Sequence, residues 1–229
     1  MAGGWKYEPK GQVARFVHSF EENVLAMTLG LMTVLTFLNV IRRYLFNASL
    51  IWSLEVVLTL FAWLVMIGIA YGFKVTAHLG VDAVTNLLSQ RSRRIMGLIS
   101  GAICIFFAVL LLKGAWDYWA PFAELPRTTG RWLPTGIDWN TRGTSYFETD
   151  QIPMPGFLKF LEDWINYGET YSKLPRTVPY VILPIAAALI LLRIVQATVR
   201  VWNGEQDSLI VSHEAEDAVE EAAAQNREA

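Results

Sequence analysis

The side chains in this 229-residue sequence with the most scope for chemistry are polar groups beside long apolar runs. Lys74, His78 and Asp82 are spaced four residues apart, so a continuous helix would place them on one face. That face could form ion pairs and hydrogen bonds, although Gly80 interrupts the stretch with a residue of low helix propensity. The spacing therefore indicates a polar stripe whose continuity depends on Gly80.

A pair of opposite charges, Arg43 and Glu55, lies where one apolar run ends and the next begins. If both runs cross a membrane, these two ends lie at the same membrane face, and the side chains come close enough to pair. In the alternative arrangement, Arg42 and Arg43 extend independently to lipid headgroups. The residue types leave both arrangements open.

The sequence shows no pattern typical of catalysis, metal binding or cofactor binding. Its histidines, His18, His78 and His213, are far apart and outside the apolar runs, which argues against a haem held inside a helix bundle. Neither a P-loop nor a nucleophile elbow is present. The single cysteine, Cys104, cannot form an internal disulfide. We expect a protein that is not an enzyme and that has no catalytic, metal or cofactor site.

Four runs without charged residues must position the polar groups: 23–41, 56–73, 95–112 and 177–192. A helix needs about 20 residues to cross about 30 Å of hydrocarbon, and backbone groups in lipid must bond within their own segment. Charged residues make up only 17% of the chain, against roughly 25% in a soluble domain. The sequence predicts an all-α integral membrane protein with four transmembrane helices, at about 22–44, 53–73, 94–117 and 177–202.

Tryptophans mark the expected membrane boundaries of these helices, at Trp52, Trp116, Trp119 and Trp202. Trp63 differs because it lies mid-span, where it faces lipid or packs on another helix. Gly68 and Gly72 are four residues apart on the second helix, a spacing that lets another backbone approach closely. The spans hold no charged residue deep inside, so the chain lacks the groups that a transporter acting alone would use.

Lysine and arginine favour cytoplasmic termini. Without the third loop, ten of them lie on the side of the termini and second loop, and two on the other side. Long loops cross a membrane largely regardless of charge. We therefore expect a membrane domain at 1–203, whose loop 118–176 lies outside the cell membrane. An acidic cytoplasmic tail is expected at 204–229.

Loop 118–176 is rich in proline, glycine and aromatic residues and is expected to be ordered, with turns. Within it, one apolar face of a short helix is formed by Phe157, Phe160, Leu161 and Trp164. That helix lies on the outer leaflet, packs on a partner, or caps the chain's own loops. A second interfacial helix is indicated after Gly80 by Val81, Val84, Leu87 and Leu88.

Four segments around the first two spans carry a resemblance to a known family: 39–46, 52–55, 68–71 and 77–82. Their pattern is Arg-Tyr, then Trp-x-x-Glu, then a small-residue span, then His-x-Gly-Val-Asp. In this order they resemble the DctQ-like small membrane subunit of tripartite ATP-independent periplasmic (TRAP) transporters. The match covers roughly 21–88, and the long third loop departs from the many members that have a short one.

The resemblance implies a non-catalytic subunit of a sodium-coupled secondary transporter in the bacterial inner membrane. It would enlarge the scaffold of a large, many-spanning elevator-type subunit, surrounded by membrane lipids and without nucleic acid. A periplasmic binding protein would deliver the substrate, an organic acid and most closely a four-carbon dicarboxylate. The positions expected in structural or interface roles are Arg43, Tyr44, Trp52, Glu55, Gly68, Gly72, Lys74, His78 and Asp82.

Two other functions compete with this one. The chain could anchor a redox or other multisubunit membrane enzyme, but histidines within the spans are missing. It could also be a small homo-oligomeric exporter, which usually needs a charged residue within a span.

Overall fold

Four long helices dominate the computed structural model, which describes residues 11–75 and 89–205. They are α1 (Gln12–Leu45), α2 (Ile51–Val75), α4 (Gln90–Trp119) and α7 (Ile182–Asn203). The short α6 (Thr177–Tyr180) precedes α7. Each long helix, with α6 counted together with α7, is long and apolar enough to cross a membrane. The prediction of a helical protein with four transmembrane helices is confirmed.

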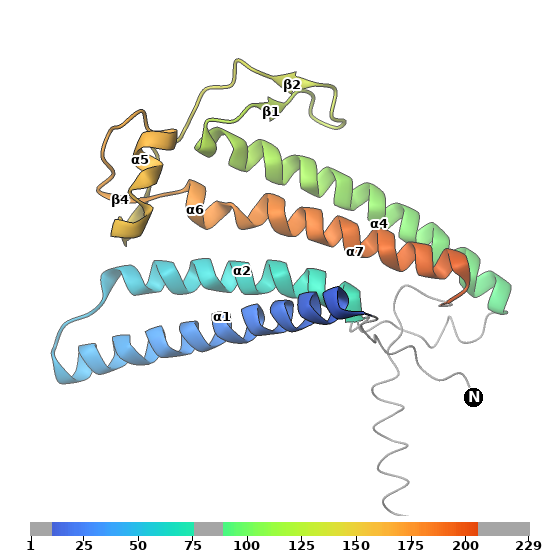
Figure 1. Ribbon diagram of the computed structural model, residues 1–229, viewed down its shortest axis with the longest axis horizontal. Coiled ribbons are helices and arrows are strands. Elements are labelled where there is room, and N and C mark those ends of the chain that lie inside the picture. The colour runs from blue at the N-terminus through green and yellow to red at the C-terminus, as the bar shows by residue number, and fades with distance from the viewer. Residues whose placement is uncertain (1–10, 76–88, 206–229) are drawn as a thin grey trace, which may run out of the picture.

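The four helices lie side by side in the order α1, α2, α7, α4 (Figure 1). The last helix in the sequence therefore lies between the second and third, and it has eight buried residues, whereas α1 has none. α1 begins, α2 ends, α4 begins and α7 ends at one end of this layer, here called the terminal end. The opposite end is called the loop end. Most of the apolar surface of α1 is left without a partner among residues 11–75 and 89–205.

Small residues allow α4 and α7 to pack closely. Gly97, Gly101 and Ala108 are buried on α4 at spacings of four and seven residues. A Cβ atom at Gly101 would lie 2.6 Å from Thr198 Oγ1 and 2.8 Å from Thr198 Cγ2 on α7. Backbones approach this closely in membranes only where one side chain is small.

Replacing Gly101 with Val is therefore expected to force α4 away from α7 and to destabilise the chain by about 2 kcal/mol. A thermal unfolding midpoint in detergent measures the loss. Gly114→Val is the matched control on the same helix, because a Cβ at Gly114 meets nothing within 4 Å. Equal midpoints for the two variants would contradict the packing described.

The segment between α4 and α7, here called the loop segment (residues 120–176), folds into ordered structure as expected. Its two antiparallel pairs are β1 with β2 and β3 with β4. The elements in chain order are η1 (Ala120–Ala123), β1 (Arg127–Thr128), β2 (Ile137–Asp138), β3 (Glu148–Pro153), η2 (Gly156–Leu158), α5 (Phe160–Ile165) and β4 (Lys173–Pro175).

Hydrogen bonds from aromatic side chains tie the loop segment to the helices. Trp116 Nε1 donates to the carbonyl of Pro126 in the loop segment at 3.0 Å, and Trp119 Nε1 donates to that of Thr177, which follows the segment as the first residue of α6, at 3.0 Å. Within the segment, the buried Tyr171 donates its hydroxyl to the carbonyl of Ser145 at 2.8 Å. Burial, and then nearby carboxylates, raise the pKa of Tyr171 to about 12, so the hydroxyl remains a donor at neutral pH.

The short helix predicted around residue 160 is present as α5, with Phe157 in the preceding η2. Leu161 is buried together with Ile165. Phe157, Phe160 and Trp164 are 80%, 56% and 77% exposed. Leu161 and Ile165 thus face the inside of the protein, while the other three predicted positions form an exposed apolar surface that is open to the outer leaflet or to a partner.

Candidate functional site

A buried ionic cluster joins three of the four long helices. Glu21 on α1 contacts Lys74 on α2 and Arg193 on α7, with Glu21 Oε2 2.5 Å from Lys74 Nζ and Oε1 2.5 Å from Arg193 Nη2. The three side chains are 14%, 1% and 11% exposed. Arg193 Nη1 also donates to Gln196 Oε1 at 3.0 Å. One carboxylate thus links α1 to both α2 and α7.

The expectation was that no charged residue lies deep inside a span; the cluster places charged residues within the helices, toward the terminal end of the layer. α1 begins at Gln12, ten residues before the predicted span, so Glu21 lies inside the helix. Arg193 lies inside α7, with buried Ile190 and Ile194 on either side. A charge in an apolar environment is tolerated when it is paired and hydrogen-bonded, and in this cluster all three groups are.

A second set of polar contacts lies beside the cluster, between α1 and α2. Tyr71 donates its hydroxyl to Glu22 Oε1 at 2.8 Å. The ring of His18 stacks on that of Tyr71 with centroids 5.8 Å apart, and His18 Nε2 lies 3.6 Å from Glu22 Oε1. This group is more exposed, since Glu22 is 51% exposed. It adds to the registration of the two helices near the terminal end.

At the loop end, Glu55 does not pair with Arg43. Its carboxylate accepts the backbone N–H groups of Asp150 at 3.0 Å and Gln151 at 2.7 Å. These amides belong to β3, so Glu55 fastens the loop segment to the start of α2. Arg43 is exposed, as is Tyr44, and forms no ion pair with any acidic residue among those described. Of the two arrangements considered, the structure therefore has the unpaired arginines.

The other predicted positions on α2 have different surroundings. Trp52 is half-buried at the start of the helix. Trp63, mid-span, donates Nε1 to the carbonyl of Pro179 at 2.9 Å and so packs on α6. A Cβ at Gly68 would meet nothing within 4 Å, so no backbone in the described part of the chain approaches there. Close approach of another helix is therefore not made at Gly68 by the described residues, whereas Gly101 on α4 makes such a contact with Thr198 on α7.

His78 and Asp82 lie outside the described residues, so the polar stripe with Lys74 stays a prediction. In ranges 11–75 and 89–205, no three His, Cys, Asp or Glu side chains gather as a set of metal ligands. The described polar groups can pair charges and hold backbone segments. They form contacts between helices and between helix and loop.

Comparison with known proteins identifies the family. The family model described as "Tripartite ATP-independent periplasmic transporters, DctQ component" matches residues 32–137. A C4-dicarboxylate TRAP transporter small permease protein DctQ of Vibrio cholerae is 42% identical over 218 residues, covering 95% of this chain and 86% of that protein. The chain belongs to the DctQ family.

Other DctQ relatives match a smaller part of the chain. The C4-dicarboxylate TRAP transporter small permease protein DctQ of Pseudomonas aeruginosa is 31% identical over 133 residues, which is 46% of this chain and 63% of that protein. A "Putative TRAP transporter small permease protein" of Haemophilus influenzae is 29% identical over 122 residues, 50% of this chain and 76% of that protein. This DctQ chain is thus a membrane component of a bacterial TRAP transporter, which favours the transporter interpretation over an enzyme anchor.

The family match and the buried cluster overlap only in part. Lys74 lies within the matched range 32–137 of this DctQ chain, whereas Glu21 and Arg193 lie outside it. Sequence reasoning missed the cluster, although one signal was available. The mostly apolar stretch 194–201 follows Arg193, so a helix that continues to Val201 places this arginine inside it, where an acidic partner would stabilise it.

Proposed function

We propose that the chain is the small permease subunit of a TRAP transporter for four-carbon dicarboxylates, and that it acts as a fixed scaffold for the large membrane subunit. The substrate class rests on the names of the Vibrio and Pseudomonas relatives. Sodium coupling and the elevator movement would belong to the large subunit. A periplasmic binding protein would deliver the substrate.

The observation that carries the scaffold role is the open layer of helices. A four-helix protein that works alone usually buries its apolar stripes in a closed bundle. In the most apolar 18-residue stretch of α1, 0% of the residues are buried, and in that of α2, 6% are buried. Such surface suits contact with lipid on one face and with a larger membrane protein on the other. The buried cluster then makes the layer rigid enough to brace that protein.

The experiment that tests the scaffold role uses Gly68, which lies in a family segment on α2 and is open toward the outside. Gly68→Leu is expected to leave the unfolding midpoint of the isolated chain unchanged and to reduce co-purification with the large subunit. Gly30→Leu is the matched control, because it is also open and lies on α1, outside the family segments. Purification of the unaltered chain alone in mild detergent, together with normal uptake in its absence, would refute the proposal.

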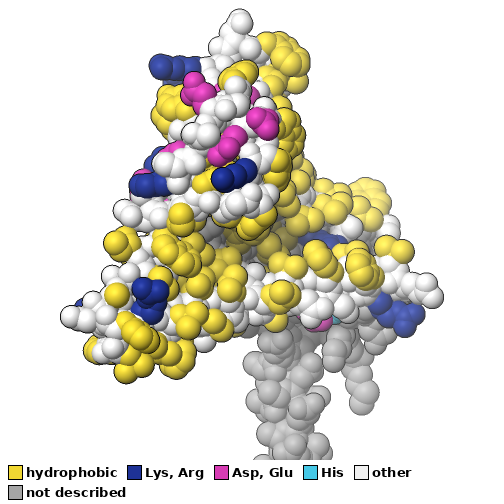
Figure 2. All heavy atoms as spheres, turned by 60° about the vertical axis from the view of Figure 1, so that its left-hand side comes forward, with side chains coloured by type: hydrophobic (Ala, Val, Ile, Leu, Met, Phe, Trp, Pro, Cys, Tyr) yellow, Lys and Arg dark blue, Asp and Glu magenta, His cyan; other side chains and the backbone are white. Residues whose placement is uncertain are grey.

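For orientation, we propose cytoplasmic termini in the inner membrane and a periplasmic loop segment, as the lysine and arginine distribution favours. Figure 2, with the loop end forward, shows hydrophobic side chains over the visible helical surface and acidic side chains gathered above them, over the loop segment. Exposed aromatic residues of that segment include Trp132, Trp139, Trp164 and Tyr167. These suit contact with the large subunit or the binding protein.

Replacing Trp164 with Ser is expected to reduce dicarboxylate uptake without lowering the unfolding midpoint, because this side chain is 77% exposed and contributes little to the fold. Uptake into cells that carry the complete transporter measures the first effect. Ile165→Ser, next to it and buried, is the contrasting variant and should destabilise the chain. Normal uptake with Trp164→Ser would argue against docking through this face of α5.

A further inference from the structure

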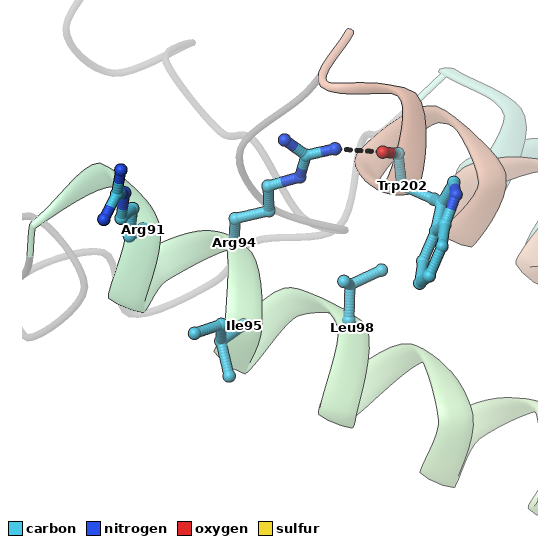
Figure 3. A pocket seen from close by; sticks show the side chains of 5 residues that line it. All are labelled: Arg91, Arg94, Ile95, Leu98 and Trp202. Atoms are coloured by element: carbon cyan, nitrogen blue, oxygen red, sulfur yellow. Dashed lines mark hydrogen bonds between the residues drawn. The ribbon is translucent and has the colours of Figure 1, made fainter.

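A groove at the terminal end lies between the start of α4 and the end of α7 (Figure 3). Its volume is about 460 Å³. Two guanidinium groups and an apolar floor line it, with contributions from Arg91, Arg94, Ile95, Leu98 and Trp202. None of the contacts that define the ionic cluster or the loop segment uses these side chains. The groove therefore needs an explanation of its own.

Arg94 is held in a defined orientation at the rim of the groove. Its Nε donates to the carbonyl of Val201 at 3.1 Å, and its Nη2 donates to that of Trp202 (Figure 3). The last carbonyls of a helix have no donor within the helix, so the guanidinium satisfies the end of α7. Its Nη1 is not used in these bonds. A fixed guanidinium with unused N–H groups is a prepared anion-binding group.

Arg91 adds a second positive charge on the same face, one helical turn before Arg94. It is exposed, and neither arginine forms an ion pair with an acidic side chain in ranges 11–75 and 89–205. The N-terminus of α4, whose Ser89 hydroxyl accepts the N–H of Ser92, adds partial positive charge nearby. An anion would complement this rim.

The apolar floor of the groove indicates what the non-anionic part of a ligand must be. Ile95 and Leu98 continue the same face of α4 toward the middle of the membrane, one turn and two turns beyond Arg91. Trp202 borders the groove and is 68% exposed. Its indole is the side chain most suited to the level of the headgroups and glycerol. A ligand that fits both parts is anionic at one end and hydrocarbon at the other.

We propose that this groove binds an anionic glycerophospholipid. Its phosphodiester would contact Arg91 and Arg94, its glycerol would lie near Trp202, and one acyl chain would lie along Ile95 and Leu98. Basic pockets at helix ends bind anionic headgroups because the phosphate is attracted to the guanidinium groups and desolvated between the helices. The bound lipid would hold the ends of α4 and α7 together at the membrane surface.

The test is native mass spectrometry of the full chain in mild detergent, titrated with phosphatidylglycerol or with phosphatidylcholine of the same acyl chains. The unaltered chain should retain phosphatidylglycerol in preference to phosphatidylcholine. Arg91→Gln should weaken phosphatidylglycerol binding by about tenfold, as expected for one charge-assisted contact. Arg91 is the residue to change because Arg94 also caps α7. Arg42→Gln, an exposed arginine at the loop end, is the matched control and should bind as the unaltered chain does.

A second measurement, the unfolding midpoint, tests whether Arg91→Gln alters the fold. It also tests whether the bound anion is a lipid or free phosphate. The unfolding midpoint should rise with phosphatidylglycerol in the unaltered chain and less in Arg91→Gln, while the two midpoints without lipid stay equal. Inorganic phosphate should produce no such rise, since it cannot fill the apolar floor. The proposal is overturned by equal binding of the two lipids, by equal losses in Arg91→Gln and Arg42→Gln, or by a response to phosphate alone.

Discussion

Replacing Glu21 with Gln is expected to destabilise the chain by about 3 kcal/mol, because it removes the carboxylate that Lys74 and Arg193 share between three helices. Lys74 is 1% exposed, so it cannot simply turn to water. The loss affects the contact between α1 and α2 and that between α1 and α7 together. A reversible unfolding titration in mixed micelles measures the change in unfolding free energy.

Glu22→Gln is the matched control for this variant. It removes the same kind of charge from the adjacent residue, but Glu22 is 51% exposed and its main contact is the hydroxyl of Tyr71. A loss well under that of Glu21→Gln is expected.

Replacing Lys74 with Met in the Glu21→Gln background should then recover part of the stability, since it removes one of the two cations that Glu21 neutralised. If Glu21→Gln and Glu22→Gln cost the same, or if Lys74→Met makes the first variant worse, the cluster does not stabilise the layer in the way described.

Replacing Glu55 with Ala is expected to release β3 from the start of α2. The carboxylate accepts two backbone N–H groups, and the loss of these charge-assisted bonds at a partly exposed site should cost about 2 kcal/mol. Hydrogen exchange at the amides of Asp150 and Gln151 should speed up by about thirtyfold, the equivalent of that free energy. The helices themselves should keep their protection, because Glu55 contacts the loop segment at its edge.

The variant Arg43→Ala distinguishes binding of Glu55 to the β3 amides from an ion pair between Glu55 and Arg43. In the structure Arg43 is exposed and Glu55 binds backbone amides, so Arg43→Ala should leave exchange at both amides unchanged. An increase as large as that of Glu55→Ala would mean that the arginine holds the carboxylate in place. The pairing inferred from the order of the apolar runs would then be correct.

The existence of the four helices was predictable because the energetic rule behind them is simple. Charged residues are excluded from hydrocarbon unless they have partners, so charge-free runs identify helices. The ends of the helices were less predictable, because a charged residue that has a partner can lie inside a helix. α1 begins at Gln12, before Glu21 and Glu22, because partners on other helices make those charges tolerable inside the helix.

The contacts between helices could not be derived from the sequence because they depend on the spatial order. Glu21 and Arg193 are 172 residues apart, and only the position of α7 beside α2 brings them together. Glu55 illustrates a second limit. Its partners are backbone N–H groups of β3, which any residue type can supply, so no pairing of charges along the sequence reveals them.

The order of the helices also has a consequence for biogenesis. The helix in the middle of the layer, α7, is the last of the four to leave the ribosome, since chains are made from the N-terminus. The α1–α2 hairpin and α4 therefore enter the membrane before the helix that joins them exists. Until α7 inserts between them, they are two separate pieces connected by unfinished chain. The described helices thus become one layer only after α7 has been made, and a chain truncated before α7 would lack the surface that braces a partner.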